Sequence, residues 1–202
     1  MKATFALVLA VVGALSASVA ARQLTLDPTA WRIDTQNSAA GFAVRHMLVA
    51  TVRGQLGPIA GTVKYDGKDV SSIQVDVTID VRKLNSGNEA RDNHLRTDDF
   101  FNATKYPEIT FKSKRVMAGD AEHFKLVGDL RIRDVTKEVT LDVEGPAPIL
   151  RTSKEQRTAA AATTTVNRFD YGLRWNSLIE TGGAVVAAEV KITIDLQITR
   201  TP

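Results

Sequence analysis

The most constraining feature of this sequence is a strict alternation of apolar and polar residues between residues 186 and 198. Every second residue is apolar: Val186, Ala188, Val190, Ile192, Ile194, Leu196 and Ile198. The residues between them are mostly polar: Ala187, Glu189, Lys191, Thr193, Asp195 and Gln197. A helix would spread these charges over all its faces, whereas a strand places successive side chains on opposite faces. The segment is therefore predicted to be an unusually long strand with one buried face.

The same alternation recurs along the chain. It is clear over 73–81, 124–132 and 139–144, and shorter candidate strands lie near 41–46, 48–56, 59–65, 107–115 and 159–168. Strands with one apolar face must bury these faces together, either between two sheets or inside a closed barrel. Closure removes exposed strand edges, which favours the barrel for long strands. We therefore predict an all-β fold, an antiparallel β-barrel of about eight strands.

Three segments depart from the alternation. Residues 88–99 are polar except for Ala90 and Leu95, and we predict a short exposed helix between strands. Residues 147–158 show no period and are expected to form a mobile loop. Residues 159–166 consist of alanine, threonine and one valine, so they leave room inside a barrel or permit the close approach of a neighbouring element. The first of these two interpretations predicts a cavity.

The first twenty residues have the pattern of a secretory signal peptide. Lys2 precedes an apolar run over 5–15, and Ser18 and Ala20 are spaced like the small residues of a cleavage site. The run is too short to cross a bilayer, which needs about 20 apolar residues. We therefore expect a signal peptide over 1–20, cleavage near Ala20 or Ala21, a linker over 21–30 and a barrel domain over 31–200.

The sequence contains no cysteine, so it forms no disulfide and carries no lipid on an N-terminal cysteine. An exported domain without disulfides favours a bacterial periplasm over a eukaryotic secretory pathway. The expected product is a soluble periplasmic protein that is not a lipoprotein. Its formal net charge of +3 is too small to indicate a nucleic-acid partner.

The polar residues of the sequence match no established catalytic or metal-binding motif. The three histidines, His46, His94 and His123, lie far apart and lack the spacing of metal ligands. No nucleophile motif such as Gly-x-Ser-x-Gly occurs. Arg91, Asp92 and His94 are interpreted as an ion pair or cap that ties the helix to the barrel, with acid–base catalysis as the alternative. We expect no metal and no enzymatic activity.

Several blocks of residues resemble the YceI-like proteins, a bacterial lipocalin-like family described as polyisoprenoid-binding. The resemblance covers the chain from Trp31 to about Arg200. In chain order, the blocks are Trp31-Arg32-Ile33-Asp34, Phe42-Ala43-Val44-Arg45-His46-Met47 with Gly54, Arg91-Asp92-Asn93-His94-Leu95-Arg96, Asp99-Phe100-Phe101, Lys105-Tyr106-Pro107-Glu108-Ile109-Thr110-Phe111, Gly128-Asp129-Leu130, Val135-Thr136-Lys137, and Asn167-Arg168-Phe169-Asp170-Tyr171-Gly172-Leu173 with Trp175.

The chain departs from the family pattern at three positions. Asn37 stands where the family usually has histidine, Asp134 where it has glycine, and Glu138 where it has proline. If the missing histidine touches the ligand headgroup in relatives, the substitution at Asn37 alters headgroup preference here.

The resemblance implies a lipocalin-like barrel that holds an isoprenoid or fatty acyl chain, with no catalysis, metal or other cofactor. The ligand classes are an isoprenoid quinone, a polyprenyl phosphate or a fatty acid-type lipid, bound for transport, storage or sequestration. Two alternatives stay open: an accessory protein of a membrane respiratory or stress-response system, and an enzyme acting on an isoprenoid headgroup. A homodimer is a further expectation. Transient contact with a membrane surface is another, through the basic residues over 112–137.

The expected ligand-binding residues come from the apolar phase of the strands and from the aromatic residues. The candidates for the apolar cavity are Phe42, Val44, Val75, Val77, Phe100, Phe101, Phe111, Phe124, Leu126, Leu130, Ile132, Trp175, Val190, Ile192 and Ile194. The candidates for the headgroup are His46 and Arg168. A register that turned the strand residues outward would expose a large apolar band, so they are expected to point inward.

Export is tested by the intact mass of the protein secreted from a bacterial host. The expected mass is that of a chain beginning directly after Ala20 or Ala21, because signal peptidase cuts after small residues at that spacing. The same measurement on protein made without the first twenty residues provides the control. A secreted protein whose mass retains Met1 to Val19 contradicts the prediction.

Overall fold

The computed structural model describes residues 27–47, 49–117, 119–120, 122–176 and 185–201. The strands are β1 (Ala30–Ile33), β2 (Ala39–His46), β3 (Ala50–Gly57), β4 (Ile59–Lys64), β5 (Gln74–Asp80), β6 (Glu108–Met117), β7 (His123–Ile132), β8 (Val135–Glu144), β9 (Leu150–Arg151), β10 (Gln156–Asn167) and β11 (Val186–Arg200). The helices are α1 (Glu89–Arg96) and the short 3-10 turns η1 (Val70–Ser72), η2 (Val81–Lys83) and η3 (Arg168–Tyr171).

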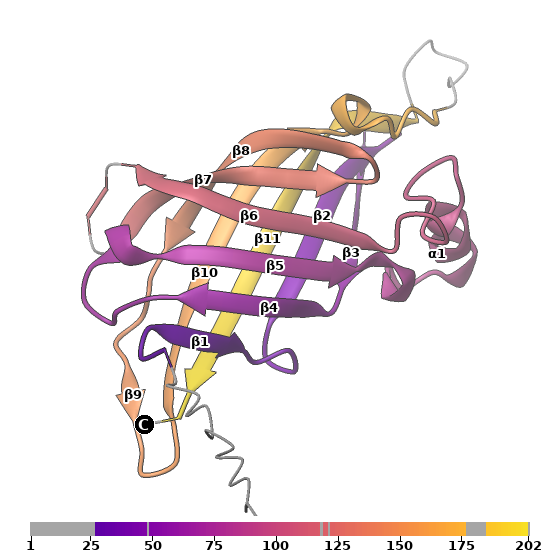
Figure 1. The fold of residues 1–202 in the computed structure, drawn as a ribbon. Helices are drawn as coiled ribbons and strands as arrows, with labels where there is room; N and C mark the ends of the chain where they lie inside the picture. Colours follow the sequence, from indigo (N-terminus) through magenta and orange to yellow (C-terminus); the bar gives the residue numbers. More distant parts are fainter. Residues whose placement is uncertain (1–26, 48, 118, 121, 177–184, 202) are drawn as a thin grey trace, which may run out of the picture.

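The strands form one antiparallel sheet that closes on itself (Figure 1). Around the ring the order is β11, β1, β4, β5, β6, β7, β8 and β10, and β10 pairs with β11 to close it. This last pairing is the longest, with continuous register from Gln156 opposite Arg200 to Asn167 opposite Glu189. The prediction of an antiparallel barrel of about eight strands, with a short helix between strands, is confirmed.

One edge of β11 pairs with two strands in succession, which gives the barrel two levels. Its C-terminal end pairs with β1, where Ile33 lies opposite Ile198. The rest of this edge pairs with β2, from Asp195 to Val186. Strand β3 pairs with the free edge of β2 in antiparallel orientation. The other edge of β3 forms an isolated β-bridge with the chain after β5, between Gln55 and Asn85. The hairpin of β2 and β3 therefore extends the wall beyond the level of β1 and β4.

Helix α1 lies at one end of the barrel, beside the ends of β5 and β6 (Figure 1). Its N-terminus is capped by Asn88, whose side chain accepts a hydrogen bond from the Arg91 N–H. At its C-terminus Arg96 donates to the backbone carbonyls of Arg82 and Leu84, at 2.9 and 2.8 Å. These two bonds fasten the helix to the chain that follows β5. The predicted helix over 88–99 is thus present as an eight-residue helix, Glu89–Arg96, with Asn88 and Thr97 as its caps.

The polar cluster at the start of α1 binds the loop before it. The buried Asp92 carboxylate accepts hydrogen bonds from the Ser86 N–H, at 2.9 Å, and from the Ser86 hydroxyl. Arg91 donates to the Ser86 hydroxyl and to the Ser86 carbonyl, at 2.7 and 2.8 Å. His94 pairs with Asp99 beyond the helix, at 2.8 Å. Arg91 and Asp92 are therefore joined through Ser86 and tie the helix to the chain before it.

Two segments differ from the sequence prediction. The expected mobile loop over 147–158 contains β9, whose Arg151 lies opposite Gln156, and the start of β10. Its turn is held by the Thr152 hydroxyl, which accepts from the N–H groups of Lys154 and Glu155. Strand β1 has only four residues, too few for alternation to show, and it carries the fully buried Trp31. The expected signal peptide, and the linker as far as residue 26, lie outside the described residues.

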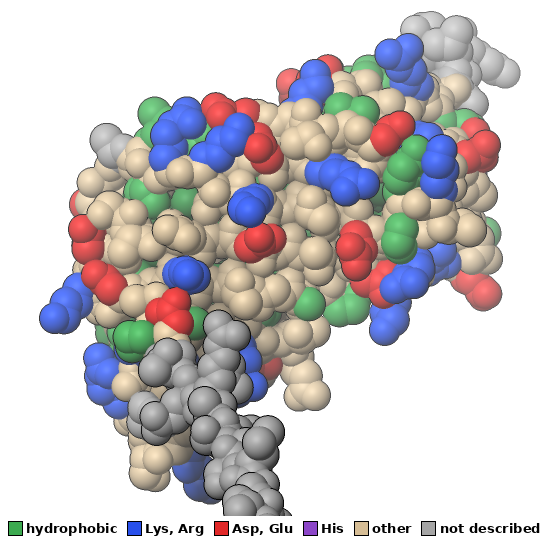
Figure 2. Space-filling view, in the orientation of Figure 1, with side chains coloured by type: hydrophobic (Ala, Val, Ile, Leu, Met, Phe, Trp, Pro, Cys, Tyr) green, Lys and Arg blue, Asp and Glu red, His purple; other side chains and the backbone are tan. Residues whose placement is uncertain are grey.

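The outer face of β6, β7 and β8 carries paired charges (Figure 2). Lys114 lies 2.6 Å from Asp129 and 3.3 Å from Glu138, and Arg115 also pairs with Glu138. Such exposed pairs contribute at most about 1 kcal/mol each. They offset much of the positive charge over 112–137 that suggested contact with a membrane. Within the described ranges, no helix has the length and apolar character needed to cross a bilayer.

The contacts of Asp92 predict a structural role that can be measured. In Asp92→Ala the partly buried N–H of Ser86 loses its acceptor, and leaving such a donor unpaired typically costs about 1–3 kcal/mol. For a domain of this size the melting temperature should fall by about 2–10 °C. Asp98→Ala, which removes an exposed carboxylate two residues after the helix, is the control and should melt like the wild type. Equal melting temperatures for the two variants contradict the structural role.

Candidate functional site

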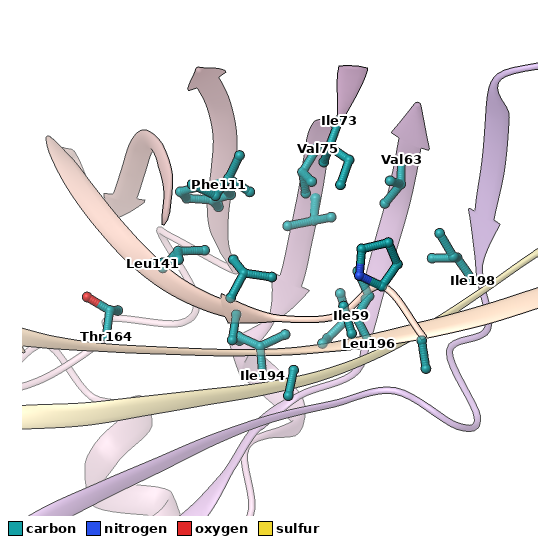
Figure 3. A pocket seen from close by; sticks show the side chains of 18 of the residues that line it. Ile59, Val63, Ile73, Val75, Phe111, Leu141, Thr164, Ile194, Leu196 and Ile198 are labelled. Carbon is teal, nitrogen blue, oxygen red and sulfur yellow. The ribbon is translucent and has the colours of Figure 1, made fainter. Parts of the chain in front are cut away.

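The interior of the barrel contains a small apolar cavity, the smaller chamber, with a volume of about 130 Å³. Its wall is built from β4, β5, β6, β7, β8, β10 and β11, and Figure 3 shows side chains from opposite strands pointing into it. The polar side chains in the wall are Tyr65, Thr158 and Thr164. The hydroxyl of Thr158 donates to the Ala147 carbonyl at 2.6 Å. The smaller chamber is therefore suited to an apolar group.

Small residues make room for this chamber. Ala159, Ala160, Ala161, Ala162 and Thr164 of β10 all line it, as expected from the cavity interpretation of this run. The close-approach interpretation also applies, because a Cβ atom on Gly145 would lie 3.0 Å from the Cα of Ala160. Small side chains in β10 thus serve both the cavity and the packing of the chain after β8.

A second cavity, the larger chamber, has a volume of about 350 Å³ and lies at the level of β2 and β3. Its lining residues are Phe42, Val44, His46, Val52, Leu56, Ala90, Arg91, His94, Leu95, Phe100, Phe101, Ile109, Ile132, Val166, Arg168, Leu173, Trp175, Val186, Val190 and Ile192. Helix α1 and the chain around η3 therefore complete the wall that β2, β3 and β11 begin. Cavities of this size and character are typical of small-molecule sites.

An aromatic cluster stands in the wall of the larger chamber. The His94 ring meets Phe100 and Trp175 edge to face, with centroids 5.1 and 4.9 Å apart. Phe100 and Trp175 are 5.3 Å apart. Edge-to-face packing of this kind adds about 0.5–1.5 kcal/mol to area burial. The cluster joins α1 to the chain after η3 across this end of the barrel.

Two aromatic rings, those of Phe42 and Phe111, each rest on a glycine. A Cβ atom on Gly54 would lie 2.7 Å from the Phe42 ring, and one on Gly128 would lie 2.6 Å from the Phe111 ring. Glycine on the neighbouring strand therefore lets each ring lie against the sheet. Phe42 lines the larger chamber and Phe111 the smaller one.

Arg168 is buried, and its charge is held by backbone carbonyls. Its Nε donates a hydrogen bond to the Ala187 carbonyl at 2.9 Å, and its Nη2 donates one to the Val186 carbonyl at 3.1 Å. Its Nη1 donates to two carbonyls, those of Leu173 at 2.5 Å and Trp175 at 2.8 Å. Burial lowers the pKa of this guanidinium below its ordinary value. One of its five N–H groups remains for a ligand. Arg168 therefore fastens η3 to the start of β11 in addition to lining the chamber.

His46 differs from Arg168 in having its polar atoms available. It lies at the end of β2, opposite Val186 of β11, and lines the larger chamber. Its ring makes no hydrogen bond or ion pair with any described residue. A neutral imidazole offers one donor and one acceptor. Among the described residues, no three His, Asp or Glu side chains are grouped as a metal site.

Every residue expected in the cavity from the sequence lines one of the two chambers. Eight line the smaller one: Val75, Val77, Phe111, Phe124, Leu126, Leu130, Ile192 and Ile194. Seven line the larger one: Phe42, Val44, Phe100, Phe101, Ile132, Trp175 and Val190. Both headgroup candidates, His46 and Arg168, also line the larger chamber. Their contact with a ligand stays a prediction.

Several lining residues were not expected. Leu56 and Ile109 border both chambers, although each stands near the end of its strand, where alternation does not show which side chains meet across a barrel. Arg91 and His94 line the larger chamber from α1. The sequence marked both residues as part of a polar cluster on the helix and of a block shared with the family, but their segment has no apolar period to place them at a cavity.

Comparison with known proteins agrees with this architecture. Residues 31–198 match the model of the YceI-like domain. The UPF0312 protein SA2479 of Staphylococcus aureus is 35% identical over 167 residues, which cover 81% of this chain and 93% of that protein. The crystal structure of the Campylobacter jejuni YCEI protein is 27% identical, with a TM-score of 0.64 over 78% of this chain and 90% of that one.

Two more distant structures share the fold. BcnA of Burkholderia cenocepacia is 21% identical, with a TM-score of 0.69 over 82% of this chain and 98% of that one. A polyisoprenoid binding domain from Saccharophagus degradans is 16% identical, with a TM-score of 0.60 over 85% and 98% of the two chains. Given the extent of the domain match and the identity to the staphylococcal relative, this chain belongs to the YceI-like domain family.

Proposed function

We propose that this protein binds one long apolar lipid, an isoprenoid or fatty acyl chain, inside the barrel and acts as a carrier or store rather than as an enzyme. The observation that carries the proposal is the pair of apolar chambers in the interior, with charged and imidazole side chains in one of them. A lipid tail gains about 0.8 kcal/mol for each CH₂ group that it removes from water. The barrel supplies the dry wall that this transfer needs.

The family relationship supports a lipid ligand. One structural neighbour is described as a polyisoprenoid binding domain, and it shares the barrel with this chain. The ligand classes that fit are an isoprenoid quinone, a polyprenyl phosphate or a fatty acid. Each combines a long apolar tail with a polar end that His46 can bind by hydrogen bonding. The pattern of the first twenty residues supports a periplasmic location.

The polar residues of the larger chamber support binding rather than catalysis. Arg91 and Arg168 are held by Ser86 and by backbone carbonyls, so their positions serve the fold. His94 packs between Phe100 and Trp175 and pairs with Asp99. In this environment the imidazole supports the aromatic cluster. The enzymatic alternative can be tested by incubating the purified protein with isoprenoid lipids. Chemical conversion of the headgroup in that assay would favour an enzyme.

Organic extraction of the purified protein, followed by mass spectrometry, tests the proposal. We expect about one lipid per wild-type chain. Val190→Trp should retain less than about a tenth of it, because the indole occupies the larger chamber and displaces buried CH₂ groups. Glu189→Trp is the matched control, since the neighbouring position on β11 is exposed and does not line a chamber.

A thermal melt of each variant separates two outcomes. If the larger chamber holds lipid, Val190→Trp folds and loses ligand. If that space is instead closed by side-chain packing, the substitution overpacks it and costs about 1–3 kcal/mol of stability. The carrier function is ruled out if the wild-type protein yields no lipid on extraction and takes up neither an isoprenoid nor a fatty acid. The accessory role in a membrane system is then the alternative that is left.

A further inference from the structure

Three exposed apolar side chains lie at one end of the barrel. Among the residues that the structure describes, the large apolar side chains that are exposed are Met47, Val49, Met117, Leu150 and Phe169. Met47 and Val49, which are 49% and 80% exposed, belong to the turn between β2 and β3. Phe169, which is 37% exposed, belongs to η3. Met47, Val49 and Phe169 are here termed the apolar rim.

Hydrogen bonds place the two elements of the apolar rim beside each other. The Met47 N–H donates to the Val185 carbonyl at 2.8 Å, and the buried Arg168 donates to the Val186 carbonyl at 3.1 Å. Both elements therefore bind the chain where β11 begins, at one end of the barrel (Figure 1). His46 and Arg168, each of which directly precedes a residue of the rim, line the larger chamber. The apolar rim thus borders this chamber.

The fold of the turn does not require an apolar side chain at Met47. Its φ is 50°, in the left-handed region that favours glycine and asparagine, and these are the residues that short turns between antiparallel strands prefer. Its side chain is half exposed, so it gains little from burial within the chain. A polar residue would suit both the backbone and the exposure better. The apolar character of the turn therefore points to a partner that covers it.

The exposed ring of Phe169 is held in a fixed position. The Asn167 side chain accepts a hydrogen bond from the Phe169 N–H at 3.0 Å. The guanidinium carbon of Arg168 lies 4.3 Å from the centre of the ring, and backbone carbonyls hold Arg168 in turn. A ring that is already fixed loses little side-chain entropy when a partner covers it. Phe169 is therefore prepared for contact with an apolar phase.

Basic residues outnumber acidic ones around the apolar rim. The hairpin of β2 and β3 contains Arg45 and Arg53 and no acidic residue. With the chain around η3 and the start of β11 included, the exposed basic residues are Arg45, Arg53, Arg174 and Lys191, and the exposed acidic residues are Asp170 and Glu189. Because a strand rises about 3.4 Å per residue, Arg45 lies about 7 Å along β2 from Met47. At this distance its side chain reaches lipid headgroups when the rim enters a bilayer.

The size and charge of this surface fit a lipid bilayer better than a folded protein. Three side chains bury far less than the roughly 800 Å² per partner of a standard protein interface. A bilayer needs no matching shape, and it binds through inserted apolar side chains together with attraction between basic residues and anionic lipids. The excess of basic residues beside the rim therefore favours a membrane that contains anionic phospholipid.

We propose that the apolar rim inserts into anionic phospholipid membranes and that the flanking arginines bind the headgroups. Docking in this orientation brings the larger chamber against the bilayer surface. The inference goes beyond the proposed function, because insertion of the rim requires no lipid inside the barrel. It also assigns membrane contact to a different surface from the basic residues over 112–137, which belong to β6, β7 and β8.

The absence of cysteine from the sequence permits a position-specific test. Val49→Cys, labelled with the environment-sensitive dye nitrobenzoxadiazole, reports insertion of the rim. Leu150→Cys is the matched control, because Leu150 is exposed on β9, which pairs with the start of β10, whereas η3 follows its end. With vesicles of phosphatidylcholine and phosphatidylglycerol, the emission of the dye at position 49 should rise and shift to shorter wavelength. The dye at position 150 should not respond.

Flotation of unlabelled protein with the same vesicles measures the affinity. Val49→Ser should weaken binding about tenfold, since an apolar side chain of this size contributes about that factor when it is inserted. Arg53→Gln should weaken binding about fivefold, the contribution of one basic residue near an anionic surface. The controls Leu150→Ser and Arg151→Gln, at the other end of β10, should bind like the wild type. All four side chains are exposed, so the variants should melt like the wild type.

The inference is overturned if the wild type does not float with anionic vesicles, or if it binds vesicles of phosphatidylcholine alone equally well. Equal responses of the dye at positions 49 and 150, or equal binding by Val49→Ser and the wild type, overturn it too. A dimer in native mass spectrometry that Val49→Ser dissociates, without vesicle binding, assigns the rim to a second copy of this chain instead. Extraction of lipid from the purified protein tests the proposed function separately, so either proposal can fail alone.

Discussion

The pairing of β11 along both of its edges is the interaction on which the rest of the structure depends. One edge is paired with β10 from Glu189 to Arg200, and this pairing closes the barrel. The other edge serves β1 and then β2, which creates the two levels. On this strand Val190 lines the larger chamber, Ile192 lines both chambers and Ile194 lines the smaller one. A register slip of one residue would turn all three outward, so one strand fixes both the closure and the interior.

The end of the barrel that carries polar groups depends on backbone hydrogen bonds more than on charge pairing. Arg168 joins η3 to β11 through four carbonyl oxygens, and Arg96 joins α1 to the chain after β5 through two. Charged groups that bind carbonyls in this way are satisfied within the protein. The free hydrogen-bonding capacity of the larger chamber therefore lies in His46, in the one remaining N–H group of Arg168 and in the N–H groups of Arg91 that Ser86 does not bind.

Much of this architecture could be predicted from alternation, because a half-buried strand requires it. The residues over 186–198 and 124–132 show which face is buried, and closure follows from the number of such strands. Alternation could not reveal β1, which is too short, or β9, which is held by hydrogen bonds of Thr152. Nor could it show that Leu56 and Ile109 line both chambers, since which side chains meet across a barrel depends on strand tilt and register. Local periodicity gives the face of a residue but not its partner on the opposite wall.

The hollow interior would link the stability of the barrel to its ligand. A ligand that binds the folded barrel and not the unfolded chain raises the free energy of unfolding, and the gain grows with the ratio of free ligand to Kd. Because the walls of both chambers are mostly apolar, most of that gain would come from apolar surface that is removed from water. On the proposed function, a lipid in the interior therefore stabilises the folded barrel as well as being its cargo.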